Sequence, residues 1–208
     1  MAIYIIMAVI AYAIGSINFS IIFSKKFAGF DVREKGSGNA GTTNMLRSVG
    51  KGLAALTLIC DILKGVISIL IAIGIGKIAK DIKPEIVVQV AGIFAIIGHT
   101  FPVYFGFKGG KGVATSLGIL LLTNWQIGLI CMVFALVLMI LTRMVSLGSI
   151  MAAVLFPILT IFITDNYIVE GNYIIFGLIM ALIVIFNHRS NIKRIYNGEE
   201  NRLSLKKS

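Results

Sequence analysis

Residues 53–76 read LAALTLICDILKGVISILIAIGIG, an apolar run interrupted by charge only at Asp61 and Lys64. A helix needs about 20 apolar residues, at about 1.5 Å of rise each, to cross the hydrocarbon core of a bilayer. The run is therefore long enough to span a membrane with some tilt. Because an unpaired charge is costly inside a membrane, we expect Asp61 and Lys64, three residues apart, to form a buried structural ion pair.

The rest of the chain has the same apolar character. Of its 208 residues, 58% are hydrophobic, only 13% are charged and three are proline. A soluble domain of this size has too little interior to bury that much apolar surface. We therefore expect residues 1–208 to form a single transmembrane domain, an all-α polytopic integral membrane helical bundle. The other candidate spans are residues 2–24, 85–107, 113–123, 126–142, 145–164 and 172–187.

The number of crossings depends on residues 113–123, which are too few to span comfortably. Loop charges decide between six and seven. With seven crossings, fifteen of the nineteen Lys and Arg residues fall in the inside segments and three in the outside loops. Such an excess marks the cytoplasmic side. We therefore predict seven transmembrane helices, with the N-terminus outside and the C-terminus cytoplasmic. The inside segments are then residues 25–52, 108–112, 143–144 and 188–208.

The first inside segment contains the glycine-rich stretch GSGNAGTTNMLR at residues 36–47. Glycines let backbone N–H groups approach an anion, and hydroxyl, amide and guanidinium groups donate hydrogen bonds to phosphate oxygens. A flexible linker is the alternative interpretation. The candidate phosphate ligands are Ser37, Gly38, Asn39, Thr43, Asn44 and Arg47.

The second stretch is FKGGKGVATS at residues 107–116. The spacing of a nucleotide-binding P-loop and its preceding strand are both missing, so an NTPase is rejected. Glycines, two ammonium groups and the start of a helix still favour a phosphate. The alternative is a short turn with lysines on the positive side. The candidate residues are Lys108, Gly109, Gly110, Lys111, Gly112 and Thr115.

The third stretch is NHRSNIKR at residues 187–194, where the last span leaves the membrane. His188 and Asn191 share a helical face, and a histidine with a reference pKa near 6.5 could handle a proton. Arg189 and Arg194 add positive charge, and we expect Glu200 to orient Arg194 or the tail. Arg143, in the short inside turn, is one more candidate anion contact. A snorkelling anchor at the membrane exit is the alternative interpretation.

Other chemistries have little support in the sequence. No His, Asp and Glu set has the spacing of metal ligands, and no Ser-His-Asp or Cys-His arrangement is evident. Cys60 and Cys131 lie in separate apolar runs, which argues against a disulfide or a zinc site. His99, followed by Pro102, is expected to be a structural histidine at a kink. We therefore expect no metal and no cofactor.

Together the three stretches resemble the motifs of the bacterial glycerol-3-phosphate acyltransferases that use acyl phosphate. Residues 37–47, 108–115 and 188–200 carry the resemblance, which extends over essentially the whole chain. It implies transfer of a fatty acyl group from acyl phosphate to the 1-hydroxyl of glycerol 3-phosphate. The products would be 1-acylglycerol 3-phosphate (lysophosphatidate) and phosphate, in the first step of phospholipid synthesis.

The resemblance also implies roles and a location. The expected catalytic residues are His188, Asn191, Ser37 and Arg47, and the other candidates named above would bind substrate. Which stretch binds which phosphate stays open, as does the choice between His188 and the leaving phosphate as proton acceptor. The expected site faces the cytoplasm from the cell inner (plasma) membrane, with the lipid bilayer as partner, no nucleic acid, and a monomer as one possible oligomeric state.

A membrane transporter for phosphorylated anions is the competing class of function. Its basic segments would form a cytoplasmic vestibule. Against it, an alternating-access carrier binds its substrate near the midplane, often between inverted repeats, and the sequence contains no convincing repeat. Phosphate release from the two substrates would separate an enzyme from a transporter.

Overall fold

Every regular element of the described chain is helical. The computed structural model describes residues 1–79, 82–163 and 173–203, and for these residues the all-α prediction is confirmed. The α-helices are α1 Ala2–Gly15, α2 Phe19–Phe23, α3 Thr42–Ser48, α4 Lys51–Ile78, α5 Pro84–Thr100, α6 Val113–Thr123, α7 Trp125–Thr142, α8 Val145–Phe162, α9 Tyr173–Asn187 and α10 Arg189–Tyr196. Short helical turns of other types are η1 Ser24–Ala28, η2 Val32–Glu34 and η3 Val103–Phe105.

Within the described residues, five helical segments are long and apolar enough to cross a membrane. A sixth is present if α9 and α10, which bend by 61° at their junction, count as one span. α6 is an apolar helix of only 11 residues, so length and composition alone do not give the predicted seven. The five segments are Ala2–Ala28, Lys51–Ile78, Pro84–Phe105, Trp125–Thr142 and Val145–Phe162.

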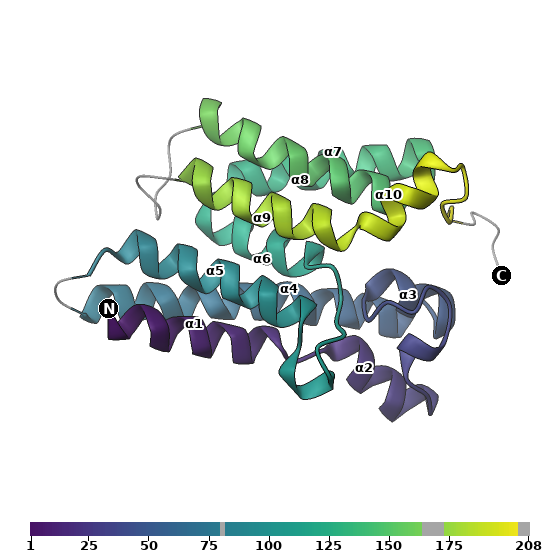
Figure 1. Ribbon diagram of the computed structural model, residues 1–208, viewed down its shortest axis with the longest axis horizontal. Helices are drawn as coiled ribbons and strands as arrows, with labels where there is room; N and C mark the ends of the chain where they lie inside the picture. The colour runs from purple at the N-terminus through teal and green to yellow at the C-terminus, as the bar shows by residue number, and fades with distance from the viewer. Residues whose placement is uncertain (80–81, 164–172, 204–208) are drawn as a thin grey trace.

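The long helices form two groups joined by α6. α1, α4 and α5 pack together in one group and α7, α8 and α9 in the other; α6 contacts both α4 and α7, and α5 also packs on α9 (Figure 1). The short helices α2, α3 and α10 lie at the same end of the bundle, opposite the N-terminus (Figure 1). The first and third stretches, which include most of α3 and α10, therefore lie at the same end.

Glycines allow two helix pairs to approach closely. A Cβ atom on Gly15 would lie 2.2 Å from the carbonyl oxygen of Ala95, and one on Gly98 would lie 2.3 Å from that of Tyr12. α4 and α6 have the same kind of contact, since a Cβ on Gly118 would lie 2.1 Å from the carbonyl oxygen of Ile62. Small residues at such crossings are typical of membrane helices.

The predicted first span, residues 2–24, is broken between α1 and α2. The Asn18 side chain accepts a hydrogen bond from the Ile21 amide at 3.1 Å and so caps α2. The Lys64 ammonium donates to the carbonyl of Ile17 at 2.9 Å and lies 3.0 Å from the Asp61 carboxylate. The predicted buried ion pair is therefore confirmed, and it also stabilises the helix break.

Candidate active site

Two adjoining cavities lie at the end of the bundle where the three stretches meet. The larger has a volume of about 500 Å³ and continues between the long helices. The smaller, of about 280 Å³, is bounded by the loop before α6 and the start of α10. Both are lined by Ser37, Asn39, Lys111 and Arg194. A molecule in either cavity would therefore meet the same two cations.

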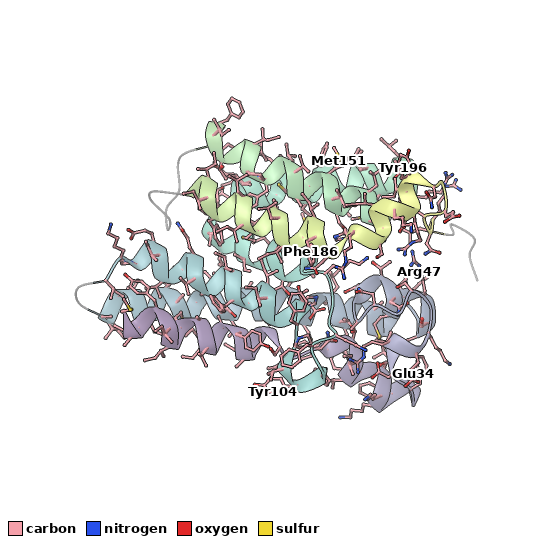
Figure 2. The ribbon with its side chains drawn as sticks, viewed as in Figure 1. Glu34, Arg47, Tyr104, Met151, Phe186 and Tyr196 are labelled. Atoms are coloured by element: carbon pink, nitrogen blue, oxygen red, sulfur yellow. The ribbon has the colours of Figure 1, made fainter. Side chains whose placement is uncertain are left out.

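The smaller cavity is polar and basic. Its described lining contains no acidic side chain but four cationic ones, Lys108, Lys111, Arg189 and Arg194. Lys108 and Arg189 are exposed, and the Arg189 guanidinium also stacks 4.7 Å from the ring centre of Phe186, which Figure 2 labels. Ser37, Gly38, Asn39, Gly109 and Gly110 complete much of the wall. Cations without carboxylates suit a doubly charged phosphate group.

Gly109 and Gly110 line this cavity, but their N–H groups are not free to hold an anion. The Gly109 amide donates to the carbonyl of Thr100 at 3.0 Å and the Gly110 amide to that of His99 at 3.1 Å. A Cβ atom on either glycine would lie 2.1 Å from an atom of His99. The expected backbone cradle is therefore wrong for these two residues, and they are glycine because the loop packs directly on the end of α5.

Asn44 organises the first stretch. Its side-chain oxygen accepts a hydrogen bond from the Ser37 amide at 2.9 Å, and its side-chain nitrogen donates to the carbonyls of Val32 at 2.8 Å and Lys35 at 3.0 Å. Both ends of the amide are occupied, and the residue is 1% exposed. Asn44 therefore shapes the loop that presents Ser37 and Asn39, although the sequence predicted a direct phosphate contact.

Arg33, which was not among the sequence candidates, links the segment before the first stretch to the second stretch and to the turn that precedes it. Its guanidinium donates to the carbonyls of Phe105 at 2.7 Å and Lys108 at 3.2 Å. Asp31 fixes its orientation through Nε at 3.0 Å and a second nitrogen at 2.8 Å. These bonds lower the pKa of Asp31 to about 2, against the opposing effect of burial. The sequence did contain a signal for this ion pair, since Asp31 and Arg33 are two residues apart and carry opposite charges.

Glu200 joins the third stretch to α8. Its carboxylate accepts hydrogen bonds from Ser146 at 3.0 Å, Asn191 at 2.8 Å and Arg194 at 2.9 Å. The expected orientation of Arg194 by Glu200 is therefore confirmed. The side-chain oxygen of Asn191 also accepts a hydrogen bond from the Lys111 ammonium, so Asn191 links Lys111 to Glu200.

Lys111 supplies charge from a partly buried position and Arg47 from an exposed one. Burial lowers the pKa of Lys111 to about 8, although Glu200 acts in the opposite direction. Burial also lowers the pKa of Arg47, but a guanidinium stays charged at neutral pH. Arg47 lines the larger cavity, and Figure 2 labels it between α3 and α10.

His188 lines the larger cavity and is 3% exposed. Its Nδ1 lies 2.8 Å from the carbonyl oxygen of Val184. A carbonyl can only accept, so Nδ1 carries the proton and Nε2 is left with a lone pair. Burial, and then the charge of Lys111, lower the pKa of His188 to about 4. The ring is therefore neutral at pH 7.

The remaining sequence candidates divide into two sets. Thr43 and Gly112 line the larger cavity. Arg143 is exposed between α7 and α8 and lines neither cavity, and its carbonyl accepts a hydrogen bond from the Leu203 amide at 2.7 Å. Thr115 is fully buried, and its carbonyl lies against Gly65 of α4. Arg143 and Thr115 are therefore not brought into the site.

Beyond its polar end, the larger cavity is apolar. α6, α7, α8 and α9 all contribute side chains to it, among them Leu120, Cys131, Phe156 and Met180. In the part of the chain that the structure describes, no group of three or more His, Cys, Asp or Glu could hold a metal ion. The arrangement fits an amphiphile with an anionic head and an apolar tail, beside a second small anion.

Known proteins share this sequence and fold. A family model described as glycerol-3-phosphate acyltransferase matches residues 5–198. A glycerol-3-phosphate acyltransferase of Clostridioides difficile is 42% identical over 98% of this chain and 97% of its own. One of Mesorhizobium japonicum is 44% identical, over 97% of each chain.

Solved structures agree with the sequence comparison. The crystal structure of PlsY, an integral membrane glycerol 3-phosphate acyltransferase, in its glycerol 3-phosphate form superposes with a TM-score of 0.85 and 34% identity. That match covers 97% of this chain and 96% of the other. The lysophosphatidic acid form of the same enzyme gives a TM-score of 0.82 and 32% identity over 97% and 95% of the two chains.

Proposed function

Because this chain belongs to the glycerol-3-phosphate acyltransferase family, we propose that it takes its acyl group from acyl phosphate and transfers it to the 1-hydroxyl of glycerol 3-phosphate. The chain is an integral membrane acyltransferase of lipid biosynthesis, and glycerol 3-phosphate is the acceptor. Family membership decides against a transporter of phosphorylated anions. The identity of the donor, the roles of the residues and the orientation in the membrane belong to the proposal.

One observation carries the choice of donor: the two cavities share a wall that contains Lys111 and Arg194. Glycerol 3-phosphate, small and doubly charged, suits the small basic cavity. Acyl phosphate suits the larger one, with its phosphate beside Arg47 and its chain between the helices. The two phosphates would then flank the shared cations, which keeps the hydroxyl close to the acyl carbonyl.

The proposed chemistry needs no covalent enzyme intermediate. The oxygen of the 1-hydroxyl attacks the carbonyl carbon of the acyl phosphate, and the bond from that carbon to the phosphate oxygen breaks. The hydroxyl proton passes to the departing phosphate. Lys111 and Arg194 stabilise the negative charge that develops on this leaving group, a contribution of the kind that dominates many enzymes. Asn191 and Glu200 act as positioning residues for both cations.

We assign the proton to the phosphate because His188 is a poor base. General-base catalysis works best when the pKa lies near the operating pH, and the pKa of His188 is lowered to about 4. Its role is then to orient the attacking hydroxyl through Nε2. His188→Ala should keep kcat within about tenfold of the wild type, whereas the loss of a general base costs about 10²–10⁴-fold. A loss in that larger range would restore His188 as the base.

We further propose one domain with seven crossings, the N-terminus outside, and a site that faces the cytoplasm from the plasma membrane. The gathering of α2, α3 and α10 at one end of the bundle supports this topology (Figure 1). The excess of basic residues in segments 25–52, 108–112, 143–144 and 188–208 supports it too. α6 would be the short crossing, sheltered by α4 and α7. No second copy is needed to complete either cavity, which is compatible with a monomer.

The donor is tested by direct assay. The purified protein, in detergent or a lipid mesophase, should release inorganic phosphate from acyl phosphate only when glycerol 3-phosphate is present. Acyl-CoA of the same chain length serves as the control donor and should release no thiol. Thiol release from acyl-CoA without phosphate release from acyl phosphate would contradict the proposed donor while leaving the acceptor intact.

A further inference from the structure

Along α8 from Ser146 onward, the side chains that line the larger cavity change from small to large. Ser146 is bonded to Glu200 and so marks the polar end. Ser149, Ala152 and Ala153 follow along the cavity, and Phe156 is the last α8 residue that lines it. The small side chains leave space for a narrow apolar ligand, and the phenyl ring of Phe156 closes that space.

The deep end of the cavity is closed. Four lining residues, one each from α6, α7, α8 and α9, belong to one buried hydrophobic cluster and are at most 6% exposed: Leu120, Cys131, Phe156 and Met180. By contrast, Leu58 of α4 is 40% exposed and Leu136 of α7 is 49% exposed, although both line the same cavity. The opening toward the bilayer therefore lies along the side, nearer the polar end, while the far end is sealed by protein.

Phe156 is held in place by other aromatic rings. Its ring meets Tyr173 edge to face, with centres 5.9 Å apart, and Phe176 in the same way at 6.4 Å. The Tyr173 hydroxyl is in turn hydrogen-bonded to Thr123 at 2.8 Å. Neither Tyr173 nor Phe176 lines the cavity. The Phe156 ring thus separates the cavity from an aromatic cluster and has little freedom to move aside.

The distance from the polar end to this ring is comparable to a fatty acyl chain. Ser146 and Phe156 are ten residues apart on α8, so at 1.5 Å of rise per residue the wall is about 15 Å long, or roughly a dozen methylene groups of an extended chain. A longer chain would have to leave through the side opening, and a shorter one would leave apolar wall unfilled. Both are less favourable than filling the cavity.

We propose that Phe156 determines the acyl-chain length of the donor by closing the end of this cavity. The proposal rests on the assignment of the larger cavity to the acyl chain in the proposed function. Removal of the ring should admit a longer chain. A larger side chain one turn closer to the polar end should favour a shorter one.

The test measures kcat/KM for a homologous series of saturated acyl phosphates with wild type, Phe156→Ala and Ala153→Leu. One helix turn is about 5.4 Å, so we expect the optimum to lengthen by about two to four carbons in Phe156→Ala and to shorten by a similar amount in Ala153→Leu. Phe162→Ala is the matched control, since Phe162 lies on the same helix but is 76% exposed and outside the cavity. Its optimum should equal that of the wild type.

A second readout does not depend on the donor. Binding of 1-acylglycerol 3-phosphates of increasing length to the purified proteins, measured by calorimetry, should show the same shifts. If the wild type turns over no acyl phosphate, the proposed donor is wrong and the binding series still tests Phe156. Should Phe156→Ala fail to fold, Ala153→Leu alone decides. An unchanged length optimum in a folded variant, in both turnover and binding, would overturn the proposal.

Discussion

Lys111 lies where the two cavities meet, and its charge depends on pH in the physiological range. Its pKa is lowered from 10.5 to about 8, chiefly by burial, so the ammonium loses its proton as the pH rises through 8. Above about pH 7 the substrate phosphate, with a second pKa of about 6, is already a dianion. Between about pH 7 and pH 9.5, kcat/KM for glycerol 3-phosphate, which reports groups in the free enzyme, should therefore be level at first and then fall above about pH 8.

Lys111→Arg provides the control for this profile. A guanidinium stays charged over the whole range, so whatever the absolute rate of the variant, its profile should remain level above about pH 8. If kcat/KM fell equally above about pH 8 in the wild type and in Lys111→Arg, the group that loses its proton would not be Lys111.

Arg47 and Arg143 were both predicted anion contacts, and the structure separates them. Both side chains are exposed, but Arg47 lines the larger cavity and Arg143 lines neither cavity. Loss of a hydrogen bond to a charged group costs about 1.5–3 kcal/mol, so Arg47→Ala should raise KM for acyl phosphate by about 10- to 150-fold. Arg143→Ala should leave KM within about twofold of the wild type. Equal effects in the two variants would remove Arg47 from the site.

At the scale of single elements, the helices were predictable and their breaks were not. The apolar runs predicted α4, α7 and α8 to within two residues at each end, although the predicted end of α8 at residue 164 lies outside the described residues. Backbone groups inside a membrane must be hydrogen-bonded within the helix, which favours long continuous helices. The break between α1 and α2 depends on the Ile17 carbonyl, which accepts its bond from Lys64, 47 residues away. The predicted span 85–107 stops as a helix at Thr100, where the amides of Gly109 and Gly110 return to bond α5. Such long-range partners leave no periodicity in the sequence.

The close packing of α1 on α5 leads to a prediction at this scale. In Gly98→Ala the new Cβ would lie 2.3 Å from the carbonyl oxygen of Tyr12, so the two helices must separate. Overpacking of this kind typically costs about 1–3 kcal/mol. The Tm of the detergent-solubilised protein should therefore fall by several degrees.

Gly74→Ala is the matched control for Gly98→Ala. Gly74 lies within α4, and a Cβ there would meet no atom within 4 Å. Alanine also has the higher helix propensity, so Tm should be unchanged or slightly raised. A Gly98→Ala protein as stable as Gly74→Ala would show that α1 and α5 are not as tightly packed as described.

At the scale of the whole molecule, the sequence predicted which residues lie near one another. It did not predict which of them face the cavities and which only hold the loops in place. Ser37, Lys111, His188 and Arg194 do meet, because three motifs on one side of the membrane must share one end of the bundle. The sequence assigned substrate contacts to Asn44, whose amide is fully occupied by the loop itself. It also overlooked Arg33, whose partners Phe105 and Lys108 are 72 and 75 residues away. Residue type indicates what a side chain can bind, and only the fold decides whether it is already bound.

The proposed topology depends on whether α6 counts as a crossing. α4 is one unbroken helix of 28 residues, so Lys51 and Lys77, 26 residues apart, are separated by about 39 Å. This exceeds the roughly 30 Å hydrocarbon core, and the two residues must lie on opposite sides of the membrane. Lys193 of α10 is exposed. With seven crossings, Lys193 lies on the same side of the membrane as Lys51. With six crossings, it lies on the same side as Lys77.

Single cysteines at these three positions distinguish the two topologies, in a background with Cys60 and Cys131 replaced by alanine. In intact cells, a membrane-impermeant maleimide should label Lys77→Cys and should leave Lys51→Cys and Lys193→Cys unlabelled until the membrane is permeabilised. Because Lys193 follows His188 and Asn191 on the same short segment, its side of the membrane is also the side from which the substrates must arrive. Labelling of Lys193→Cys together with Lys77→Cys in intact cells would mean six crossings, and the third stretch would then lie across the membrane from the first, which the shared cavities do not allow.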